Sequence, residues 1–455
     1  MKGHVPTPDD LAEKMVRRLF RDDPPERTDR ILYPGCGDGP FAAAVQRVCD
    51  SEGWSIPTGF AVDTNPEHLS RARDRKLENV EFRELDFLSA EMLEKGSFDY
   101  IVGNPPYVPI EGLDEEEKQR YKREFTTAIE RFDLYLLFFE RSLSLLADGG
   151  VMSFVTPEKF EYVDTAAPLR RLLTNGVHIE EIEHLDEDSF TGLVTFPCIT
   201  TLRSISSGPE ETIVTLRDES THKTMLPTDG SSWAPNIRGA DVADLETGAT
   251  LDDVTLRISC GMATGADRVF VFDQNEQPED IDSEWVRPTV SGRQLQELDS
   301  PYTDKVFICP YRDDGSLPDE DELGTFGDWA TGHRERLEDR SCVKKQGKKW
   351  YAWHENPPLE DILQPKIVWR DIAKEPKFWA EKEGDVVPKH SVYYAVPREG
   401  VSIDAIVEYL NSPEARMWLE AHCQKAANGY YRLQSRVLKN LPVPKEWAET
   451  FQATL

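Results

Sequence analysis

The sequence lacks paired cysteines, a long apolar run and an apolar leader, and each absence excludes a class of protein. Its seven cysteines stand singly, with no CxxC pair, so neither a zinc site nor a disulfide framework is indicated. No apolar stretch approaches the roughly 18 residues that a membrane-spanning helix needs, and residues 1–8 hold no apolar signal core. We therefore expect a soluble, cytoplasmic protein that binds no metal and no membrane.

The chain is also poor in basic residues. Its 53 Lys and Arg stand against 84 Asp and Glu, and the formal charge of −31 argues against a nucleic-acid partner. An acidic excess spread along the whole chain is typical of a halophilic protein, and in about 1 M salt a Debye length of roughly 3 Å screens repulsion from phosphates. Whether the chain can bind a nucleic acid then depends on the charge of local stretches and not on the total. Residues 331–380 hold 11 basic and 8 acidic residues, and residues 414–440 hold 5 and 2, so we expect basic surface in the C-terminal half.

The length of 455 residues and the pattern along the chain indicate two domains. Short apolar runs alternate with amphipathic segments over residues 1–205, which predicts an α/β domain with a mostly parallel, Rossmann-like sheet. A helix over 134–146 is apolar at nearly every position and should be buried. Residues 206–250 are rich in Gly, Ser, Thr, Pro and Asp and are interpreted as a linker or edge excursion, and 251–455 as a mixed α+β domain. The strands expected in the first domain cover residues 30–33, 59–62, 80–84, 98–102, 150–155, 178–184 and 198–204.

A glycine-rich turn and two carboxylates follow the first three of these strands. The turn reads Pro34-Gly35-Cys36-Gly37-Asp38-Gly39 and precedes a helix, so its backbone can bend sharply and approach a ligand. Asp63 ends the second strand, where it can accept both hydroxyls of a ribose. Asp86 follows the third, where it can accept from an adenine amine while Phe87 packs on the ring. Each Asp alone could be a turn or N-cap residue, but together they favour an adenosine-containing cofactor, either NAD or S-adenosylmethionine.

The most specific feature follows the fourth strand and reads Asn104-Pro105-Pro106-Tyr107. Two prolines keep the backbone extended and remove two N–H donors, which leaves carbonyl groups available. An aromatic amine is a poor nucleophile because its lone pair is delocalised, and acceptors such as the Asn104 side chain and the Pro105 carbonyl can draw its nitrogen toward tetrahedral geometry. Tyr107 offers a face for stacking the target base, worth about 1–3 kcal/mol. Asn356-Pro357-Pro358-Leu359 has neither a preceding strand nor a following aromatic residue and is interpreted as a loop without chemistry.

These motifs resemble the gamma-class N6-adenine DNA methyltransferases, the TaqI-like group, in order and spacing. Residues 4–8, His-Val-Pro-Thr-Pro, look like the N-terminal motif of the family, which implies that Thr7 contacts the cofactor. The resemblance implies S-adenosyl-L-methionine as cofactor, Asn104 to Tyr107 as the catalytic motif, and a site-specific adenine methyltransferase that rotates its target out of double-stranded DNA. It also implies that Phe196, in Val194-Thr195-Phe196-Pro197, stacks on the base opposite Tyr107; the alternative is a core phenylalanine at a strand start.

In the same family the domain over 1–205 would bind cofactor and catalyse transfer, and 251–455 would recognise the DNA target. Arg432 and Gln434 have side chains able to read guanine and adenine edges. Lys344, Lys345, Lys348 and Lys349, beside Trp350, Tyr351 and Trp353, form either a phosphate-tracking strip with stacking rings or a solvated loop next to core aromatics.

We expect a monomer that acts either in a restriction-modification system, beside a separate cognate endonuclease, or as an orphan methylase. Two other functions stay open at this point. One is methyl transfer to an RNA guanine amine or a protein glutamine through the same loop, and the other is a non-catalytic DNA-binding modification subunit.

Overall fold

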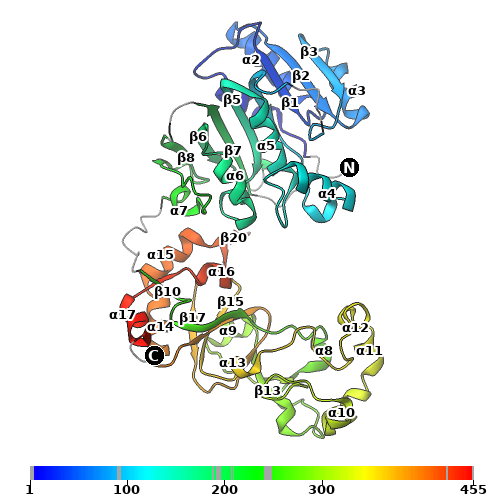
Figure 1. Cartoon of the computed structure of the whole chain (residues 1–455), viewed down its shortest axis with the longest axis vertical. Helices are drawn as coiled ribbons and strands as arrows, with labels where there is room; N and C mark the ends of the chain where they lie inside the picture. Colours follow the sequence, from blue (N-terminus) through cyan, green and yellow to red (C-terminus); the bar gives the residue numbers. More distant parts are fainter. Residues whose placement is uncertain are drawn as a thin grey trace. The chain divides into compact units, whose positions relative to one another are not determined.

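The computed structural model describes residues 5–89, 94–186, 189–190, 196–205, 208, 210–239, 248–426 and 429–452. The chain divides into two compact units, unit 1 over Met1–Gly239 and unit 2 over Ala240–Leu455. In Figure 1 unit 1 runs from blue to green and unit 2 from green to red. Among the described residues, no helix is long and apolar enough to cross a membrane.

Unit 1 is built on a nine-stranded sheet of order β3-β2-β1-β4-β5-β7-β6-β8-β9. The strands β1 to β5 run parallel to one another, whereas β7 runs antiparallel to both β5 and β6. The expected Rossmann-like sheet is confirmed, and all seven expected strands are present. The strands are β1 (Arg30–Pro34), β2 (Thr58–Asp63), β3 (Val80–Glu84), β4 (Phe98–Gly103), β5 (Leu146–Pro157), β6 (Val177–His184), β7 (Pro197–Ser204), β8 (Thr212–Thr215) and β9 (Thr221–Thr224).

Helices cover both faces of this sheet because its central strands are apolar on both sides. In β1, Ile31 and Tyr33 pack with α1 and α2 on one face, while Leu32 packs with α5 on the other. Helix α5 is buried on most sides, as its composition predicts, and Figure 1 shows it lying along β5 and β7. The helices of unit 1 are α1 (Asp9–Leu19), α2 (Pro40–Glu52), α3 (Pro66–Asp74), α4 (Glu115–Glu124), α5 (Leu134–Leu145), α6 (Ala167–Leu172) and α7 (Ala234–Ile237).

The segment expected to be a linker or edge excursion over 206–250 extends the sheet instead of leaving it. Strand β8 pairs parallel with β6, and β9 pairs antiparallel with β8. Along residues 212–215 the burial alternates as in a strand with one covered face: Thr212 and Val214 are buried, and Ile213 and Thr215 are partly exposed. Unit 1 therefore ends at Gly239, where 205 was expected.

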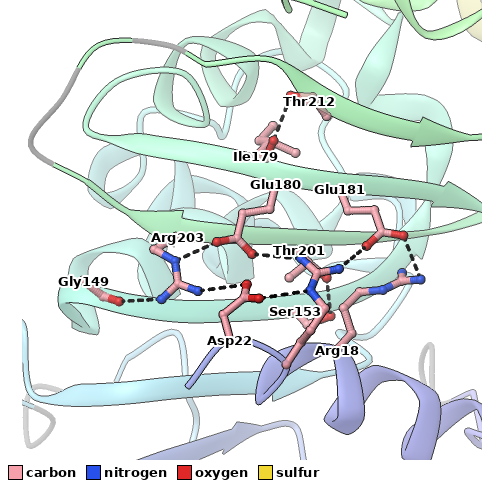
Figure 2. Close-up of polar contacts among 11 residues, drawn as sticks. Arg18, Asp22, Gly149, Ser153, Ile179, Glu180, Glu181, Thr201, Arg203 and Thr212 are labelled. Atoms are coloured by element: carbon pink, nitrogen blue, oxygen red, sulfur yellow. Dashed lines mark hydrogen bonds and ion pairs between the residues drawn. The ribbon is translucent and has the colours of Figure 1, made fainter. Parts of the chain in front are cut away.

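Helix α1 is attached to the sheet by charged side chains as well as by its apolar face. Arg18 forms ion pairs with Glu181 and Glu183 of β6, at 2.9 and 2.7 Å. Figure 2 shows the Arg18–Glu181 pair beside Arg203 of β7, whose guanidinium donates to Glu180 at 2.6 Å and to the Gly149 carbonyl at 3.3 Å. The Arg18 and Glu181 side chains are only 12% and 11% exposed, and charges this far out of water need such partners. The helix thereby fixes the chain segment that precedes it, residues 5–8.

Unit 2 is a mixed α and β domain with several small sheets, in agreement with the expectation for residues 251–455. Its sheets have the orders β11-β19-β15-β17, β12-β14-β13-β18, β16-β21-β20 and β10-β22. The strands are β10 (Ala249–Thr250), β11 (Thr255–Cys260), β12 (Val271–Asp273), β13 (Val286–Val290), β14 (Lys305–Ile308), β15 (Lys366–Arg370), β16 (Ile372–Ala373), β17 (Phe378–Glu381), β18 (Val387–Pro388), β19 (Val392–Pro397), β20 (Gln424–Ala426), β21 (Tyr430–Arg432) and β22 (Pro442–Val443). The helices are α8 (Asp267–Phe270), α9 (Gly292–Leu298), α10 (Gly324–Thr331), α11 (Arg334–Glu338), α12 (Ser341–Gln346), α13 (Leu359–Ile362), α14 (Ile403–Leu410), α15 (Pro413–His422), α16 (Ser435–Leu438) and α17 (Lys445–Gln452).

Candidate active site

A cavity of about 560 Å³ opens at the carboxyl ends of β1, β2, β3 and β4, where ligands of open parallel sheets bind. Its volume lies in the range of small-molecule sites. Pro34, Gly39, Pro105 and Tyr107 belong to the same loops but are not among its lining residues. The residues predicted from the sequence that line it are Thr7, Gly35, Cys36, Gly37, Asp38, Asp63, Asp86, Phe87, Asn104 and Pro106.

The glycine-rich turn after β1 adopts a conformation that only glycine enters without strain. Gly35, Gly37 and Gly39 have φ angles of 63°, 52° and 76°. A Cβ at Gly39 would also lie 3.3 Å from the Cβ of Ala72 on α3, so glycine allows the two helices to approach. The turn thus brings its backbone to the cavity wall and starts α2 directly behind it.

Asp63 holds the glycine-rich turn and retains capacity for a ligand. One carboxylate oxygen accepts from the Gly37 backbone N–H at 2.9 Å and the other from that of Asn65 at 2.8 Å. A carboxylate offers about four lone-pair positions, so two stay available toward the cavity. His68 of α3 also lines the cavity, with its Nδ1 3.7 Å from Asp63, and was not found from the sequence. The geometry suits a ribose whose two hydroxyls donate to Asp63.

Asp86 is more heavily occupied than the sequence suggests. Its oxygens accept from the Leu88 N–H at 3.0 Å, from the Ser89 hydroxyl at 2.8 Å and from Arg120 of α4 at 3.2 Å. One acceptor position is then left for an adenine amine. Arg120 was missed because it lies 34 residues away along the chain, in a helix that resembles a solvated surface helix. Phe87 is buried and packs against Phe138, with ring centroids 4.9 Å apart, so one edge of the adenine site is rigid.

The Asn104 side chain is oriented by the N-terminal segment. Its Nδ2 donates to the Val5 carbonyl and to the Thr7 hydroxyl oxygen, both at 3.1 Å. The Val5 carbonyl can only accept, so the amide must turn its NH₂ group toward residues 5–7 and its oxygen away. That oxygen, Oδ1, is buried and has no hydrogen-bond partner among the described residues. A buried acceptor without a donor is costly, and its persistence indicates a donor supplied by a ligand. His4, the first residue of this motif, lies outside the described residues.

Tyr107 and Phe196 lie on either side of the carboxyl end of β5. The Tyr107 hydroxyl donates to the Val155 carbonyl at 3.2 Å, and the Phe196 carbonyl accepts from the Glu158 N–H at 2.8 Å. Neighbouring strands are about 4.8 Å apart, so β4 and β7, on either side of β5, lie about 10 Å from each other. Burial raises the pKa of Tyr107 well above its usual value, so the ring stays neutral. The two residues before Phe196, Val194 and Thr195, lie outside the described residues.

In unit 2 the lysine strip is occupied by contacts inside the domain. Lys344 pairs with Asp339 and Lys349 with Asp319, and Lys348 donates to the His354 carbonyl at 2.7 Å. Lys345 has no side-chain partner among the described residues. Of the two alternatives for the neighbouring aromatics, the structure agrees with core aromatics and not with stacking rings, because packing in the core of unit 2 leaves Trp350, Tyr351 and Trp353 only 7%, 1% and 0% exposed.

Arg432 and Gln434 remain at the surface of unit 2. Arg432, on β21, is 37% exposed and donates to Asp371 at 3.0 Å, and Gln434 precedes α16. In the described part of the chain no group of three His, Cys, Asp or Glu could hold a metal ion, and all seven cysteines are free.

Comparison with known proteins identifies both halves of the chain. Residues 57–190 match the family of Eco57I restriction-modification methylases, and residues 329–443 match the TaqI-like C-terminal specificity domain. The type II methyltransferase M.PaeR7I of Pseudomonas aeruginosa is 24% identical over 94% of this chain and 83% of its own length. M.BstVI of Geobacillus stearothermophilus is 25% identical over 91% and 85%, and M.TthHB8I of Thermus thermophilus is 33% identical over 38% of each chain.

The sheet, the cavity and the methylase match together define an S-adenosylmethionine-dependent methyltransferase, with S-adenosyl-L-methionine as its cofactor. Within that class, residues 57–190 are similar to Eco57I restriction-modification methylases and residues 329–443 to the TaqI-like specificity domain, and the relatives that match most of the chain are type II methyltransferases.

Proposed function

We propose that this protein is a site-specific adenine DNA methyltransferase, which transfers a methyl group from S-adenosylmethionine to N6 of an adenine rotated out of duplex DNA. The observation that carries the proposal is the buried Oδ1 of Asn104, which has no donor among the described residues although it lines the cofactor cavity. The Pro105 carbonyl likewise receives no donor in the described part of the chain. Two adjacent acceptors match the two N–H bonds of an exocyclic amine.

The two acceptors supply what an aromatic amine lacks. Its lone pair is delocalised into the ring, and two hydrogen bonds in the Asn104 and Pro105 directions favour a tetrahedral nitrogen whose lone pair points outward. When bound, S-adenosylmethionine supplies an electrophilic methyl group on a sulfonium. The Asn104 and Pro105 acceptors would hold the amine for that transfer, and the methylated amine would release one proton to water, so no charged base would be required of the chain. This explains why position 104 is an amide and not a carboxylate.

Tyr107 and Phe196 are assigned as the two rings that hold the displaced base. Extrusion costs a few kcal/mol of stacking and pairing, and each aromatic stack returns about 1–3 kcal/mol. Their placement on opposite sides of β5 supports this role, since a base between them would lie beside Asn104 at the end of the adjacent strand β4.

DNA as substrate is supported by the relatives and by the presence of unit 2. Several relatives are named type II methyltransferases, and the match over 329–443 is to a specificity domain. Arg432 and Gln434 are the proposed base-reading residues, and Lys345 is the member of the lysine strip still available to a phosphate. A separate restriction endonuclease that cuts the same site would be the functional counterpart.

The test is to incubate the protein in molar salt with tritiated S-adenosylmethionine and, separately, unmethylated genomic DNA, RNA and protein. We expect label in DNA, recovered as N6-methyladenine after digestion and chromatography, with sequencing of the modified sites defining the recognition sequence. Label in RNA or protein but not in DNA, or label on cytosine, would overturn the assignment.

A further inference from the structure

Four ionisable side chains meet behind Phe196, away from the cofactor cavity, and no role in transfer has been given to them so far. We call them the Phe196 support cluster. Glu158 and Glu161 are each 2% exposed and His184 is 8% exposed, although charged side chains are rarely buried without partners. The cluster consists of Glu158, Glu161, His184 and Arg217.

Arg217 is the member that touches Phe196. Its guanidinium carbon lies 5.1 Å from the centroid of the Phe196 ring, within the range of a cation–π contact. Its Nε donates to the Leu185 carbonyl at 2.9 Å, and its Nη2 donates to Glu158. The side chain is 22% exposed, so it is largely fixed between these partners.

The backbone of Phe196 is attached to the same group of residues. The Glu158 N–H donates to the Phe196 carbonyl at 2.8 Å, and the Leu185 N–H donates to the carbonyl of the next residue, Pro197, at 2.9 Å. Arg217 thus bonds to the two residues, Glu158 and Leu185, whose N–H groups hold positions 196 and 197. A displacement of its guanidinium would be felt both by the ring and by the backbone of Phe196.

The charges of the cluster balance when His184 is protonated. His184 Nε2 lies 3.0 and 3.1 Å from the two Glu161 oxygens, and its Nδ1 lies 3.9 Å from Glu158. Burial alone lowers the pKa of His184, but Glu161 and then Glu158 outweigh it, so that the pKa is raised above its usual value. The groups around the imidazole are these two carboxylates, Arg217 from the turn before β9, and Cys198 on β7. Two negative and two positive charges then face one another in a site with little water.

We propose that Arg217 is a positioning residue for methyl transfer: it covers one face of the Phe196 ring and fixes the ring so that the opposite face receives the target base. This rests on the proposed function of Phe196 as a stacking residue. The ring is partly exposed directly before β7, where a phenylalanine would otherwise adopt several rotamers. Held in one orientation, it needs no reordering when the base arrives.

The first test compares Arg217→Leu with Arg203→Leu. Arg203 is a matched control because it is 26% exposed, pairs with Glu180 and donates to a backbone carbonyl, yet lies at the far end of β7 and touches no aromatic ring. We expect Arg217→Leu to lower kcat/KM for DNA about tenfold, as a stacking contact would, while the cofactor dissociation constant stays within twofold. Arg203→Leu should leave both values within twofold. Equal losses in the two variants would overturn the proposal.

The second test asks whether Arg217 acts through Phe196. Phe196→Ala should lower kcat/KM for DNA about 10- to 100-fold, and Arg217→Leu added to it should cause no further loss. Arg217→Lys keeps the cation but loses the planar fork, and should recover part of the activity. If the loss of kcat/KM in the double variant equalled the product of the two single losses, Arg217 would act independently of Phe196, and the proposal would be wrong.

The third test needs no substrate and separates this proposal from the proposed function. Hydrogen exchange of the backbone amides of Glu158 and Leu185 should speed up at least fivefold in Arg217→Leu and stay unchanged in Arg203→Leu. If the wild type transfers no methyl group to DNA, the proposed function fails, and the exchange result still decides whether Arg217 fixes the Phe196 segment. Unchanged exchange in Arg217→Leu would refute the positioning role.

Discussion

Two loops of this chain begin with the same three residues, Asn-Pro-Pro, and their surroundings differ in every respect that matters for chemistry. Asn104 is partly buried after β4, and its Oδ1 has no donor among the described residues. Asn356 is exposed, and its Oδ1 accepts from Lys348 at 2.9 Å and from Tyr311 at 3.5 Å. The comparison teaches that the motif residues alone specify little. An amide that is held from one side and left without a donor on the other, beside a cofactor cavity, is what makes the first loop a candidate site.

The largest effect should come from removing the two asparagines in parallel. Asn104→Ala is expected to lower kcat about 10³-fold, since it deletes an acceptor that acts on the reacting amine, while cofactor binding changes less than threefold. Asn356→Ala should leave transfer within twofold and cost unit 2 about 1 kcal/mol of stability through the lost hydrogen bonds. Tritium transfer, cofactor titration and thermal unfolding are the measurements. Comparable loss of transfer in both variants would show that the buried Oδ1 without a donor does not distinguish Asn104 from Asn356 in function.

The next effect concerns the cofactor cavity, which is lined in part by Asn104 and Pro106 of the first loop. Asp63→Ala should weaken cofactor binding about 100-fold, because it removes both the ribose acceptors and the anchor of Gly37. Asp99→Ala is the control, since Asp99 also accepts from a backbone N–H, that of Arg30 at 2.8 Å, but at the amino end of β4. Calorimetric titration with S-adenosylmethionine measures both. An unchanged dissociation constant for Asp63→Ala would remove its ribose role.

A smaller effect is expected when one hydrogen-bond partner of each asparagine is removed. Thr7→Val keeps the side-chain shape but deletes one of the two acceptors of Asn104 Nδ2, and should lower kcat roughly tenfold, more than it raises the cofactor dissociation constant. Lys348→Met removes one of the two donors to the Asn356 oxygen and should leave kcat unchanged. If Thr7→Val affected cofactor binding alone, Thr7 would be a cofactor contact without influence on Asn104.

The smallest effect is a dependence of stability on pH at the anchor of the first loop. Asp133 accepts from the Val108 N–H at 2.9 Å, directly after Tyr107, and burial raises its pKa to about 6. A carboxyl with a raised pKa in the folded state contributes stability below its unfolded pKa of about 3.9 and loses it as the pH rises through 6. Asp133→Asn should therefore gain up to about 2 kcal/mol over the wild type between pH 4 and pH 7. Urea unfolding at both pH values measures the difference, and parallel curves would contradict it.

The parts of this molecule that follow from local sequence were predictable, and the parts that depend on distant pairs were not. The apolar runs of β1, β4 and β5 and the apolar surface of α5 are visible in the sequence because burial on both faces leaves little room for polar residues. The loops at the carboxyl ends of β1 to β4 follow from strand order, and the structure gathers their residues in one cavity.

The contacts that complete the site join residues far apart. Arg120 pairs with Asp86 across 34 positions of the chain. Arg217 contacts Phe196 from the turn between β8 and β9, two strands that the composition of 206–250 did not predict. In the lysine strip, by contrast, the residues are adjacent in the sequence, and their spacing alone did not reveal their role. Lysines beside aromatics suggested a nucleic-acid surface, but Trp353 packs against Phe307 and Tyr311 at 4.8 and 5.7 Å between centroids, so tertiary packing decides the role of these rings.

The segment of residues 5–7 forms a wall of the cofactor cavity and also holds the amide of Asn104. The same three residues therefore bound the cofactor site and set the direction of the amide. A substitution in this short segment would change two properties together, the shape of the cofactor site and the alignment of the acceptor that faces the amine.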